Sequence, residues 1–319
     1  MRSRKQLYKY LRYTKSFHWS EFLLEHNIPI RDFAIDKKTG SVFIRPVAHS
    51  FKKGEYPVFF QGYAVYAWKF LNNGFEFVFN DQGFFVRIKE LLIRIDTLEE
   101  LYIINEVFIE NTYRIETTAS YVAFDIGMNV GITSLFLSQS ANVTKIYSFE
   151  PFGPTFKCAE ENILRNPATN GKISFYNYGL SDADKTISLP YDSSNKGNVG
   201  IKNIEGNSGA LQTIELKNAA ASLGPLIARH AGERIVAKID CEGSEYDIIE
   251  SLEKEELLPA FDILMIEWHA LEGYKQRLLQ MIESFKKNNF QVICVGSLDH
   301  EAGMLYCFKA AQPANSVHP

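Results

Sequence analysis

The 319-residue sequence predicts an α/β protein with a mostly parallel sheet, preceded by a smaller, aromatic-rich region that contains β-strands. The first observation behind this prediction is that 24 of the 43 aromatic residues lie within residues 1–120. The second is that apolar strands, glycine-rich turns and helical stretches alternate after Tyr121, which is typical of a parallel sheet covered by helices. We therefore expect an accessory region at 1–115, a main domain at 116–312 and a C-terminal tail at 313–319.

Composition excludes several classes of protein. The 34 Lys and Arg residues against 38 Asp and Glu give a net charge of −4, so no chain-wide basic field is present for nucleic acid. No apolar run reaches the ~18–20 residues of a membrane span, and the basic start is not followed by the apolar segment of a signal peptide. The four cysteines form no Cys-x-x-Cys pair, although Cys294 and Cys307 could face each other on neighbouring strands. We expect a cytoplasmic protein with reduced thiols that binds no nucleic acid.

The accessory region begins with a basic stretch. Six basic residues precede Glu21, and apolar residues recur at helical spacing from Leu7 to Leu23, which indicates an amphipathic helix. Either this helix packs on the protein through its apolar face, which we favour, or it makes a peripheral membrane contact. The aromatic residues that follow either form a core, which we also favour, or serve acceptor binding or a homo-oligomer interface. Further expected elements are strands at 41–47, 75–79 and 84–88, a turn at 80–83 and a helical stretch at 63–71.

The main domain follows a predicted helix at 98–111, which Thr97 and Glu100 open as a capping box. Residues 192–210 are rich in Asn, Gly and Ser and indicate a long surface loop. The other expected elements are, in order, strand 121–126, helix 131–140, strand 145–150, helix 154–165, strand 173–179, strand 186–190, strand 212–216, strand 234–240, helix 245–252, strand 262–267, helix 273–288, strand 290–296 and strand 303–309.

The strongest sign of a ligand site is the segment 121–132, in which an apolar strand runs into a glycine turn and then a helix. Gly127 and Gly131 allow the backbone to turn sharply and to approach a ligand closely. Asp125 places a carboxylate at the carboxyl end of the strand, where open α/β sheets bind ligands. Taken alone, the segment is equally consistent with an ordinary strand-to-helix connection.

The next strand ends in Glu150 and Pro151. An acid at this position can accept hydrogen bonds from both ribose hydroxyls of a nucleoside cofactor. The G-x-G-x-x-G fingerprint of dinucleotide binding is absent, so a nucleoside ligand without phosphates, such as S-adenosylmethionine, fits better. A nicotinamide-dependent oxidoreductase is therefore the weakest of the alternatives that we consider.

Two later strands also end in polar residues. Lys238 lies within strand 234–240, where its charge must be paired with Asp240, Asp125 or a cofactor carboxylate. Ser244, a few residues later, indicates a helix cap. Strand 262–267 leads to His269, and a histidine with an ordinary pKa near ~6.5 at a strand end is a plausible general base.

These four segments together resemble the FkbM family of S-adenosylmethionine-dependent methyltransferases. The shared motifs are D-x-G-x-N-x-G from Asp125, F-E-P ending at Pro151, K-x-D-x-E-G-x-E from Lys238 and I-E-x-H ending at His269. The resemblance implies a class I methyltransferase-type, Rossmann-like sandwich whose seven strands have the order 3-2-1-4-5-7-6, with the last strand antiparallel. It also implies methyl transfer to an oxygen, most often a hydroxyl of a sugar, glycolipid or secondary metabolite.

Methyl transfer to a hydroxyl needs a base, and strand-end placement predicts His269 in this role. Asp240, Glu242 or Glu267 would orient it, and Lys238 would belong to the same catalytic group. The resemblance indicates which residues bind the cofactor. Met128 stands where the family typically has alanine, which narrows the cofactor loop. Cofactor contacts are expected from Asp125, Gly127, Met128, Asn129, Gly131, Glu150, Pro151, Gly179, Leu180, Ser181 and Asp240.

Two alternatives stay open. A divalent metal held by the carboxylates could activate the acceptor hydroxyl, but we predict no metal site. A degenerate methyltransferase fold could serve as a binding or scaffold subunit without catalysis. The favoured hypothesis is an S-adenosylmethionine-dependent O-methyltransferase acting on a small-molecule or glycan acceptor.

Overall fold

The computed structural model describes residues 4–169, 171–193, 196, 210–297 and 300–310. The chain divides into two compact units, Met1–Asn111 and Thr112–Pro319, and this division falls four residues before the expected boundary at 115. The predicted loop at 192–210 lies almost wholly outside the described residues. Among the described residues, no helix combines the length and the apolar character that crossing a membrane requires.

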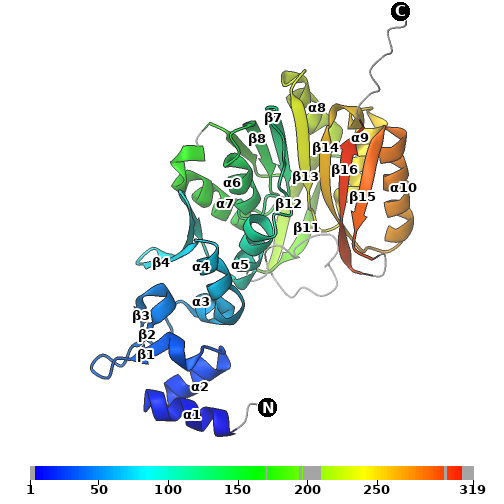
Figure 1. Cartoon of the computed structure of the whole chain (residues 1–319). Coiled ribbons are helices and arrows are strands. Elements are labelled where there is room, and N and C mark those ends of the chain that lie inside the picture. Colours follow the sequence, from blue (N-terminus) through cyan, green and yellow to red (C-terminus); the bar gives the residue numbers. More distant parts are fainter. Residues whose placement is uncertain (1–3, 170, 194–195, 197–209, 298–299, 311–319) are drawn as a thin grey trace, which may run out of the picture. The chain divides into compact units, whose positions relative to one another are not determined.

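The first unit contains two small antiparallel sheets, with strand orders β1-β2-β3 and β4-β5-β6, and several short helices (Figure 1). Its strands are β1 (Phe33–Ile35), β2 (Val42–Ile44), β3 (His49–Phe51), β4 (Glu76–Asn80), β5 (Gly83–Ile88) and β6 (Leu91–Arg94). Its helices are α1 (Arg4–Thr14), α2 (Phe17–Glu25), α3 (Pro57–Gly62), α4 (Trp68–Asn72) and α5 (Leu98–Ile104), the 3-10 helices η1 (Ile30–Asp32) and η2 (Arg45–Val47), and the π-helices η3 (Tyr63–Ala67) and η4 (Asn105–Ile109).

Local signals explain where several elements of this unit begin and end. The basic N-terminal stretch forms two helices, because the chain turns at Lys15, whose φ is 55°, and Ser16 then caps α2. Helix α1 contacts the unit through Tyr10, whose ring stacks on Phe33 at a centroid distance of 6.0 Å and whose hydroxyl donates to the carbonyl of Ile28 at 2.8 Å. The predicted strand at 41–47 is shorter than expected, because Pro46 lies in η2 directly after β2. The predicted helix at 63–71 is longer, since α3 already starts at Pro57 and continues through η3 into α4.

Aromatic side chains form much of the core of the first unit. Phe51, Phe59 and Phe60 are at most 1% exposed, and their rings pack against one another at centroid distances of 5.0–5.3 Å. Phe70 and Phe85 are fully buried as well. The high aromatic content of this region is therefore used largely for packing, as the favoured interpretation of the sequence predicted.

The second unit is an α/β sandwich. In chain order its elements are β7 (Tyr121–Ile126), α6 (Ile132–Ser138), β8 (Val143–Phe149), α7 (Gly153–Arg165), η5 (Pro167–Thr169), β9 (Ile173–Tyr176), β10 (Gly179–Ser181), β11 (Lys185–Tyr191), β12 (Ala210–Asn218), α8 (Ala219–Arg229), β13 (Arg234–Ile239), α9 (Glu245–Lys254), η8 (Leu258–Ala260), β14 (Ile263–His269), α10 (Tyr274–Lys287), β15 (Phe290–Val295) and β16 (Ala302–Lys309).

The main sheet has seven strands in the order β15-β16-β14-β13-β7-β8-β9. Strands β7, β8, β9, β13 and β14 are parallel, whereas β16 is antiparallel to both of its neighbours. Numbered along the chain, this order is 3-2-1-4-5-7-6, so the predicted fold class is confirmed. One face of the sheet packs on α8, α9 and α10, and α6 and α7 lie on the other face (Figure 1).

Sequence patterns misplaced several parts of this unit. The strand predicted at 173–179 starts as expected but is three residues shorter, because β9 ends at Tyr176 and the chain then enters β10 of a second sheet, of order β10-β12-β11. The Asn177 side chain donates to the carbonyls of Glu150 and Pro151 and so turns the chain at this point. Helix α8 was not predicted, because Gly224 and Pro225 within it resemble a turn signal.

Two smaller predictions also differ from the structure. Ser244 makes no side-chain cap on α9; instead the Glu245 carboxylate accepts a hydrogen bond from the backbone N–H of Gly243 at 2.8 Å. Cys294 and Cys307 lie on neighbouring strands but do not face each other, because Cys307 pairs with Val292. All four cysteines are free thiols.

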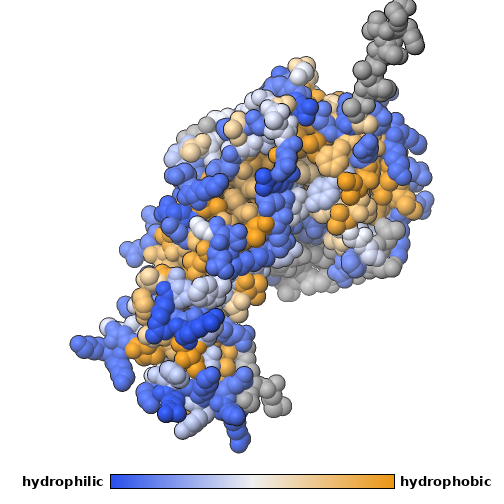
Figure 2. All heavy atoms as spheres, viewed as in Figure 1, coloured by the Kyte–Doolittle hydropathy of each residue, from blue (hydrophilic) through white to orange (hydrophobic). Residues whose placement is uncertain are grey.

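Several apolar side chains are exposed on the main sheet near its edge strand β15. Ile293, Val295 and Phe308 are 54%, 52% and 39% exposed, and Figure 2 shows the apolar area over β15 and β16. β15 is the edge strand of the main sheet. A homo-oligomer stays a prediction of the sequence, and this surface is one place where a second copy could pack.

Candidate active site

The four motifs that the sequence singled out meet at one edge of the main sheet. They follow strands β7, β8, β13 and β14, which are neighbours in the sheet and run parallel. Asp125 pairs in register with Lys238 on one side and with Ser148 on the other. The polar residues after these strands therefore form one continuous site at the carboxyl edge.

The turn after β7 packs closely against the ends of the neighbouring strands β13 and β8. Gly127 has a φ of 80°, and a Cβ atom at this position would lie only 1.8 Å from the backbone oxygen of Asp240. The N–H groups of Gly127 and Met128 donate to the carbonyl of Phe149 at 3.0 and 2.9 Å. Gly131, with a φ of 84°, then begins α6. Only glycine fits at 127, and the Met128 side chain is buried.

A buried ion pair lies directly beneath this turn. The Lys238 ammonium is 3.4 Å from Asp125 Oδ1 and 3.4 Å from Asp240 Oδ2, and it donates to the carbonyl of Gly127. Ser134 donates to the other Asp125 oxygen at 2.5 Å. Burial alone lowers the pKa of Lys238, but the two carboxylates outweigh it and raise the pKa above its ordinary value. Lys238 therefore stays charged and links the end of β13 to the end of β7. The Asp125 side chain that it contacts is fully buried.

Glu150 forms a second buried carboxylate next to the turn. Its Oε2 accepts a hydrogen bond from the N–H of Asn129 at 3.1 Å, and its Oε1 accepts one from the N–H of Phe152 at 3.0 Å. Burial raises the pKa of Glu150, these two hydrogen bonds oppose the shift, and the resulting pKa is about 8. Each oxygen keeps a further lone pair for a donor from a ligand. Pro151 follows directly, between this carboxylate and α7.

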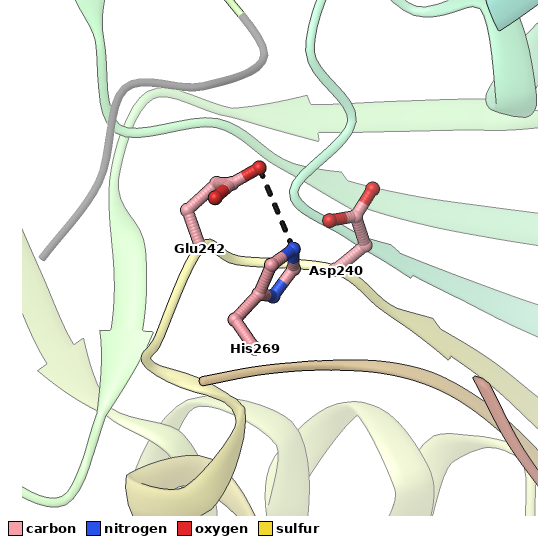
Figure 3. A group of neighbouring side chains, drawn as sticks. All are labelled: Asp240, Glu242 and His269. Atoms are coloured by element: carbon pink, nitrogen blue, oxygen red, sulfur yellow. Dashed lines mark ion pairs between the residues drawn. The ribbon is translucent and has the colours of Figure 1, made fainter. Parts of the chain in front are cut away.

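His269 ends β14 and is only 3% exposed. Glu245, fully buried, accepts a hydrogen bond from the backbone N–H of His269 at 2.7 Å, and its Oε1 lies 3.3 Å from the ring Nδ1. Since a carboxylate only accepts, Nδ1 carries a proton and Nε2 faces the open side. There Nε2 lies 3.5 Å from Glu242 Oε1 (Figure 3). It also lies 4.0 Å from Glu267 Oε1.

The charge of His269 follows from these neighbours. Burial lowers the pKa of the imidazole. The hydrogen bond to Glu245 and the negative charges of Glu245, Glu242 and Asp240 raise the pKa by more than burial lowers it, so that the resulting pKa is about 9. In the chain without ligands, His269 is therefore protonated at neutral pH. The prediction that it acts as a general base then requires a change at the site that removes this proton.

Three of the predicted cofactor contacts lie next to the site on another element. Gly179, Leu180 and Ser181 form β10, and a Cβ at Gly179 would lie 3.2 Å from the Pro151 side chain. The side chains of Leu180 and Ser181 are buried, and the Ser181 hydroxyl donates to Asp247 at 3.1 Å. Their contact with a cofactor stays a prediction.

Three residues that support the site were not among the predicted site residues. Glu245 orients His269, and Ser134 links Asp125 to Ser148 through hydroxyl contacts of 2.5 and 2.8 Å. Glu245 ends the motif that begins at Lys238, so its position was visible in the sequence. Ser134 and Ser148 give no such signal, because isolated serines are common in helices and strands.

Strand order and strand-end loops together define a class I methyltransferase-type domain. The family model described as "Methyltransferase FkbM domain" matches residues 125–292, which is just over half of the chain. The chain belongs to this family. The matched range includes every residue of the site described above.

Curated relatives and solved structures match parts of the chain. The AMB antimetabolite synthetase AmbE of Pseudomonas aeruginosa is 28% identical over 96 residues, which are 29% of this chain and 4% of AmbE. Methyltransferase sdnD of Sordaria araneosa is 24% identical over 215 residues, covering 59% of this chain and 82% of sdnD. The crystal structure of methyltransferase FkbM from Methylobacillus flagellatus is 15% identical with a TM-score of 0.40, over 64% of this chain and 47% of that one. The chain thus spans a small part of AmbE and less than half of the solved FkbM chain.

Proposed function

We propose that this chain is a methyltransferase that uses S-adenosylmethionine to methylate a hydroxyl group of a small-molecule or glycan acceptor. One observation carries the proposal: a glycine turn that covers a buried carboxylate, Glu150, lies at the same sheet edge as the His269 cluster. Membership of the FkbM family supports it. Glu150 follows β8 and His269 ends β14, and β7 and β13 lie between these two parallel strands in the sheet.

The residues at the turn fit this cofactor. Glu150 offers two carboxylate oxygens, each already held by one backbone N–H, to the two hydroxyls of a ribose. Asn129, with a φ of 49°, has a buried side-chain oxygen that accepts no hydrogen bond from the described residues. An amino group of the ligand would satisfy this oxygen. When bound, S-adenosylmethionine supplies an electrophilic methyl group on a positively charged sulfur.

The acceptor would meet the side chains at the ends of β13 and β14. Asp240, Glu242 and Glu267 are 29%, 14% and 28% exposed, so their carboxylates can reach a ligand, whereas His269 is almost completely buried. These carboxylates would hold the acceptor hydroxyl beside His269. Alignment of acceptor and methyl group supplies much of the acceleration in such displacements. His269 stays the proposed base, provided that it is first deprotonated.

The alternative of a degenerate scaffold that binds a cofactor without catalysis is less well supported. A scaffold needs neither the buried Lys238 ion pair nor the acids around His269, and both cost free energy to bury. The site retains all of them. The first unit would serve acceptor binding or assembly, and a peripheral membrane contact through α1 stays a prediction.

Calorimetric titration of the purified chain with S-adenosylmethionine and S-adenosylhomocysteine tests the cofactor assignment. We expect one site per chain and a loss of at least tenfold in affinity for Glu150→Gln, which keeps the shape of the side chain but removes its charge. Glu255→Gln, at an exposed acid, is the matched control and should bind as the wild type does. Absence of binding by the folded wild-type chain would refute the proposal.

Transfer of a labelled methyl group to saccharide, lipid and metabolite extracts then tests the acceptor class. A labelled product whose methyl group resists mild base, unlike a methyl ester, and is located on oxygen by NMR would support O-methylation of a hydroxyl. Binding of the cofactor without any labelled product would favour the scaffold. A label carried on nitrogen would retain the methyltransferase and correct the acceptor class.

A further inference from the structure

We propose that Asp240, Glu242 and His269 form a binding site for one divalent cation of the Mg²⁺ or Mn²⁺ class. Each of the three residues offers one ligand atom, and these atoms all lie within 4.8 Å of one another. They come from the ends of two adjacent strands, β13 and β14, and face a common space (Figure 3). The sequence predicted no metal site, so this inference revises that prediction.

The ligand atoms of the group lie close together without forming a short hydrogen bond between His269 and Glu242. His269 Nε2 and Glu242 Oε1 are 3.5 Å apart, which is longer than the ~2.7–3.2 Å of a good hydrogen bond. Two adjacent ligands on an octahedral Mg²⁺ ion, at bond lengths of about 2.0–2.1 Å, lie roughly 2.8–3.0 Å apart. Small side-chain movements would therefore bring all three ligand atoms onto a single ion.

The imidazole sets this group apart from an ordinary acidic patch. His269 is 97% buried, since its exposure is 3%, and its Nδ1 is held from behind by the fully buried Glu245. Glu245 is itself fixed by the backbone N–H groups of Gly243 and His269. A carboxylate that accepts from one ring nitrogen and so directs the other is the usual arrangement behind a metal-bound histidine. Nε2 is thereby aimed at Asp240 and Glu242.

The surrounding charge also favours a cation. Asp240, Glu242 and Glu267 all face the space above His269, whereas the nearby Lys238 is shared between Asp240 and Asp125. The group is therefore negative overall, and a divalent ion would offset this charge. Because two of the three ligands are carboxylates, an oxygen-preferring cation fits best, and the single imidazole is compatible with Mn²⁺.

The role of the ion rests on the proposed function, although its binding does not. Three protein ligands leave further positions on a six-coordinate cation for water and for the acceptor hydroxyl. A hydroxyl bound to the ion has a lowered pKa. Its O–H bond breaks and the proton passes to the Glu267 carboxylate, which becomes a carboxylic acid. The ion then activates the acceptor, and His269 holds the ion instead of acting as the base.

Titration with Mn²⁺ tests the site directly and needs neither cofactor nor acceptor. The full chain is treated with EDTA, dialysed and titrated with MnCl₂ while the electron paramagnetic resonance signal of free Mn²⁺ is recorded. We expect one Mn²⁺ per chain, competition by Mg²⁺, and an affinity at least tenfold weaker in Glu242→Gln and Asp240→Asn. Glu255→Gln, outside the site, should match the wild type.

A spectroscopic measurement identifies the imidazole ligand. Electron spin echo modulation of the bound Mn²⁺ should show coupling to one nitrogen, and this coupling should be lost in His269→Gln. If the wild type binds no Mn²⁺ at millimolar concentration, or if Glu242→Gln binds as tightly as the wild type, the metal site is refuted.

Cofactor titration in EDTA separates this outcome from the proposed function. Cofactor binding without Mn²⁺ binding would overturn the metal site and leave the methyltransferase proposal intact. Mn²⁺ binding with the nitrogen coupling, in a chain that binds no cofactor, would retain the metal site and refute the methyltransferase. Melting curves of each variant establish that a lost signal reports on the ligand and not on unfolding.

Discussion

Gly127 is the position in the site where a side chain larger than hydrogen should be tolerated least. Alanine there would adopt an unfavourable φ of 80° and would place its Cβ 1.8 Å from the backbone oxygen of Asp240. Gly232 has a similar φ of 90°, but nothing lies within 4 Å of its Cβ position. We expect Gly232→Ala to lower the free energy of unfolding by about 1 kcal/mol and Gly127→Ala by about 3 kcal/mol or more.

Chemical denaturation of both glycine variants checks this difference. Since both substitutions carry the same kind of backbone strain, the excess loss in Gly127→Ala measures the close approach of the two strand ends. Cofactor binding should be lost in Gly127→Ala at temperatures where the variant is still folded. Equal loss of stability in the two variants would contradict the close approach.

Glu150 makes cofactor binding depend on pH. Burial raises its pKa to about 8, so the carboxyl group is mostly protonated at pH 7 in the free chain. Ribose hydroxyls donate to the ionised form, and binding at pH 7 should therefore release up to one proton. The affinity should rise with pH up to about 8 and then level off.

Calorimetry in buffers of different ionisation enthalpy counts the released protons. Glu150→Gln has no proton to release at this position and should bind more weakly, with a smaller dependence on pH. The ligand's own titration is the same in both proteins and cancels in the comparison. An equal proton count for the wild type and Glu150→Gln would show that Glu150 is already ionised.

Sequence patterns found residues whose chemistry depends on strand-end position. Glu150 and His269 were identified because each lies at the carboxyl end of an apolar strand, where α/β sheets bind ligands, and the structure places both at one sheet edge. The raised pKa of His269 was not predictable, because it depends on Glu245, which lies 24 positions away along the chain and approaches only in the folded state. Contacts of this kind set the charge of a site, and sequence spacing does not report them.

Strand β13 shows how a single element depends on one buried charge. Lys238 is 3% exposed, and its positive charge offsets the negative charges of the Asp125 and Asp240 carboxylates. Lys238→Met would keep most of the side-chain volume but leave two carboxylates close together without their cation. We expect a loss of about 3–5 kcal/mol in the free energy of unfolding.

Thermal and chemical denaturation of Lys238→Met and a surface control measure this effect. Lys157, exposed on α7, is the matched position, and Lys157→Met should change stability by less than about 0.5 kcal/mol. If stability is partly recovered in the double variant Asp125→Asn with Lys238→Met, the loss in Lys238→Met is due to the unpaired Asp125 carboxylate. A stability equal to that of the wild type would mean that the ion pair contributes nothing net.

At the scale of elements, regular patterns were predictable and interruptions were not. Strands β7, β13 and β14 are mostly apolar, and their ends were predicted to within two residues. Helix α8 was missed because Gly224 and Pro225 lie inside it, where Asn218 caps the first turn and packing overrides the weak local preference. The break between β9 and β10 depends on the Asn177 side chain and on a second sheet, neither of which has a periodic signature.

At the scale of the whole molecule, the two units are built on different principles. The first has small sheets and an aromatic core, and the second has one large sheet with an aliphatic core on its α8–α10 face. The change in composition near residue 120 signalled this division, although it did not reveal what the first unit does. All the residues of the candidate site belong to the second unit.

The second unit should therefore bind the cofactor by itself. In a chain that starts at Thr112, the seven-stranded sheet, the glycine turn and Glu150 are all retained. We expect this truncated chain to fold cooperatively and to bind S-adenosylmethionine within about threefold of the full chain, because no residue of the proposed cofactor site is removed. Circular dichroism melting and calorimetric titration of both chains measure this, and methyl transfer to the acceptor should be lost if the first unit binds the acceptor. A truncated chain that fails to fold would instead assign the first unit a structural role, and one that retains full turnover would exclude it from acceptor binding.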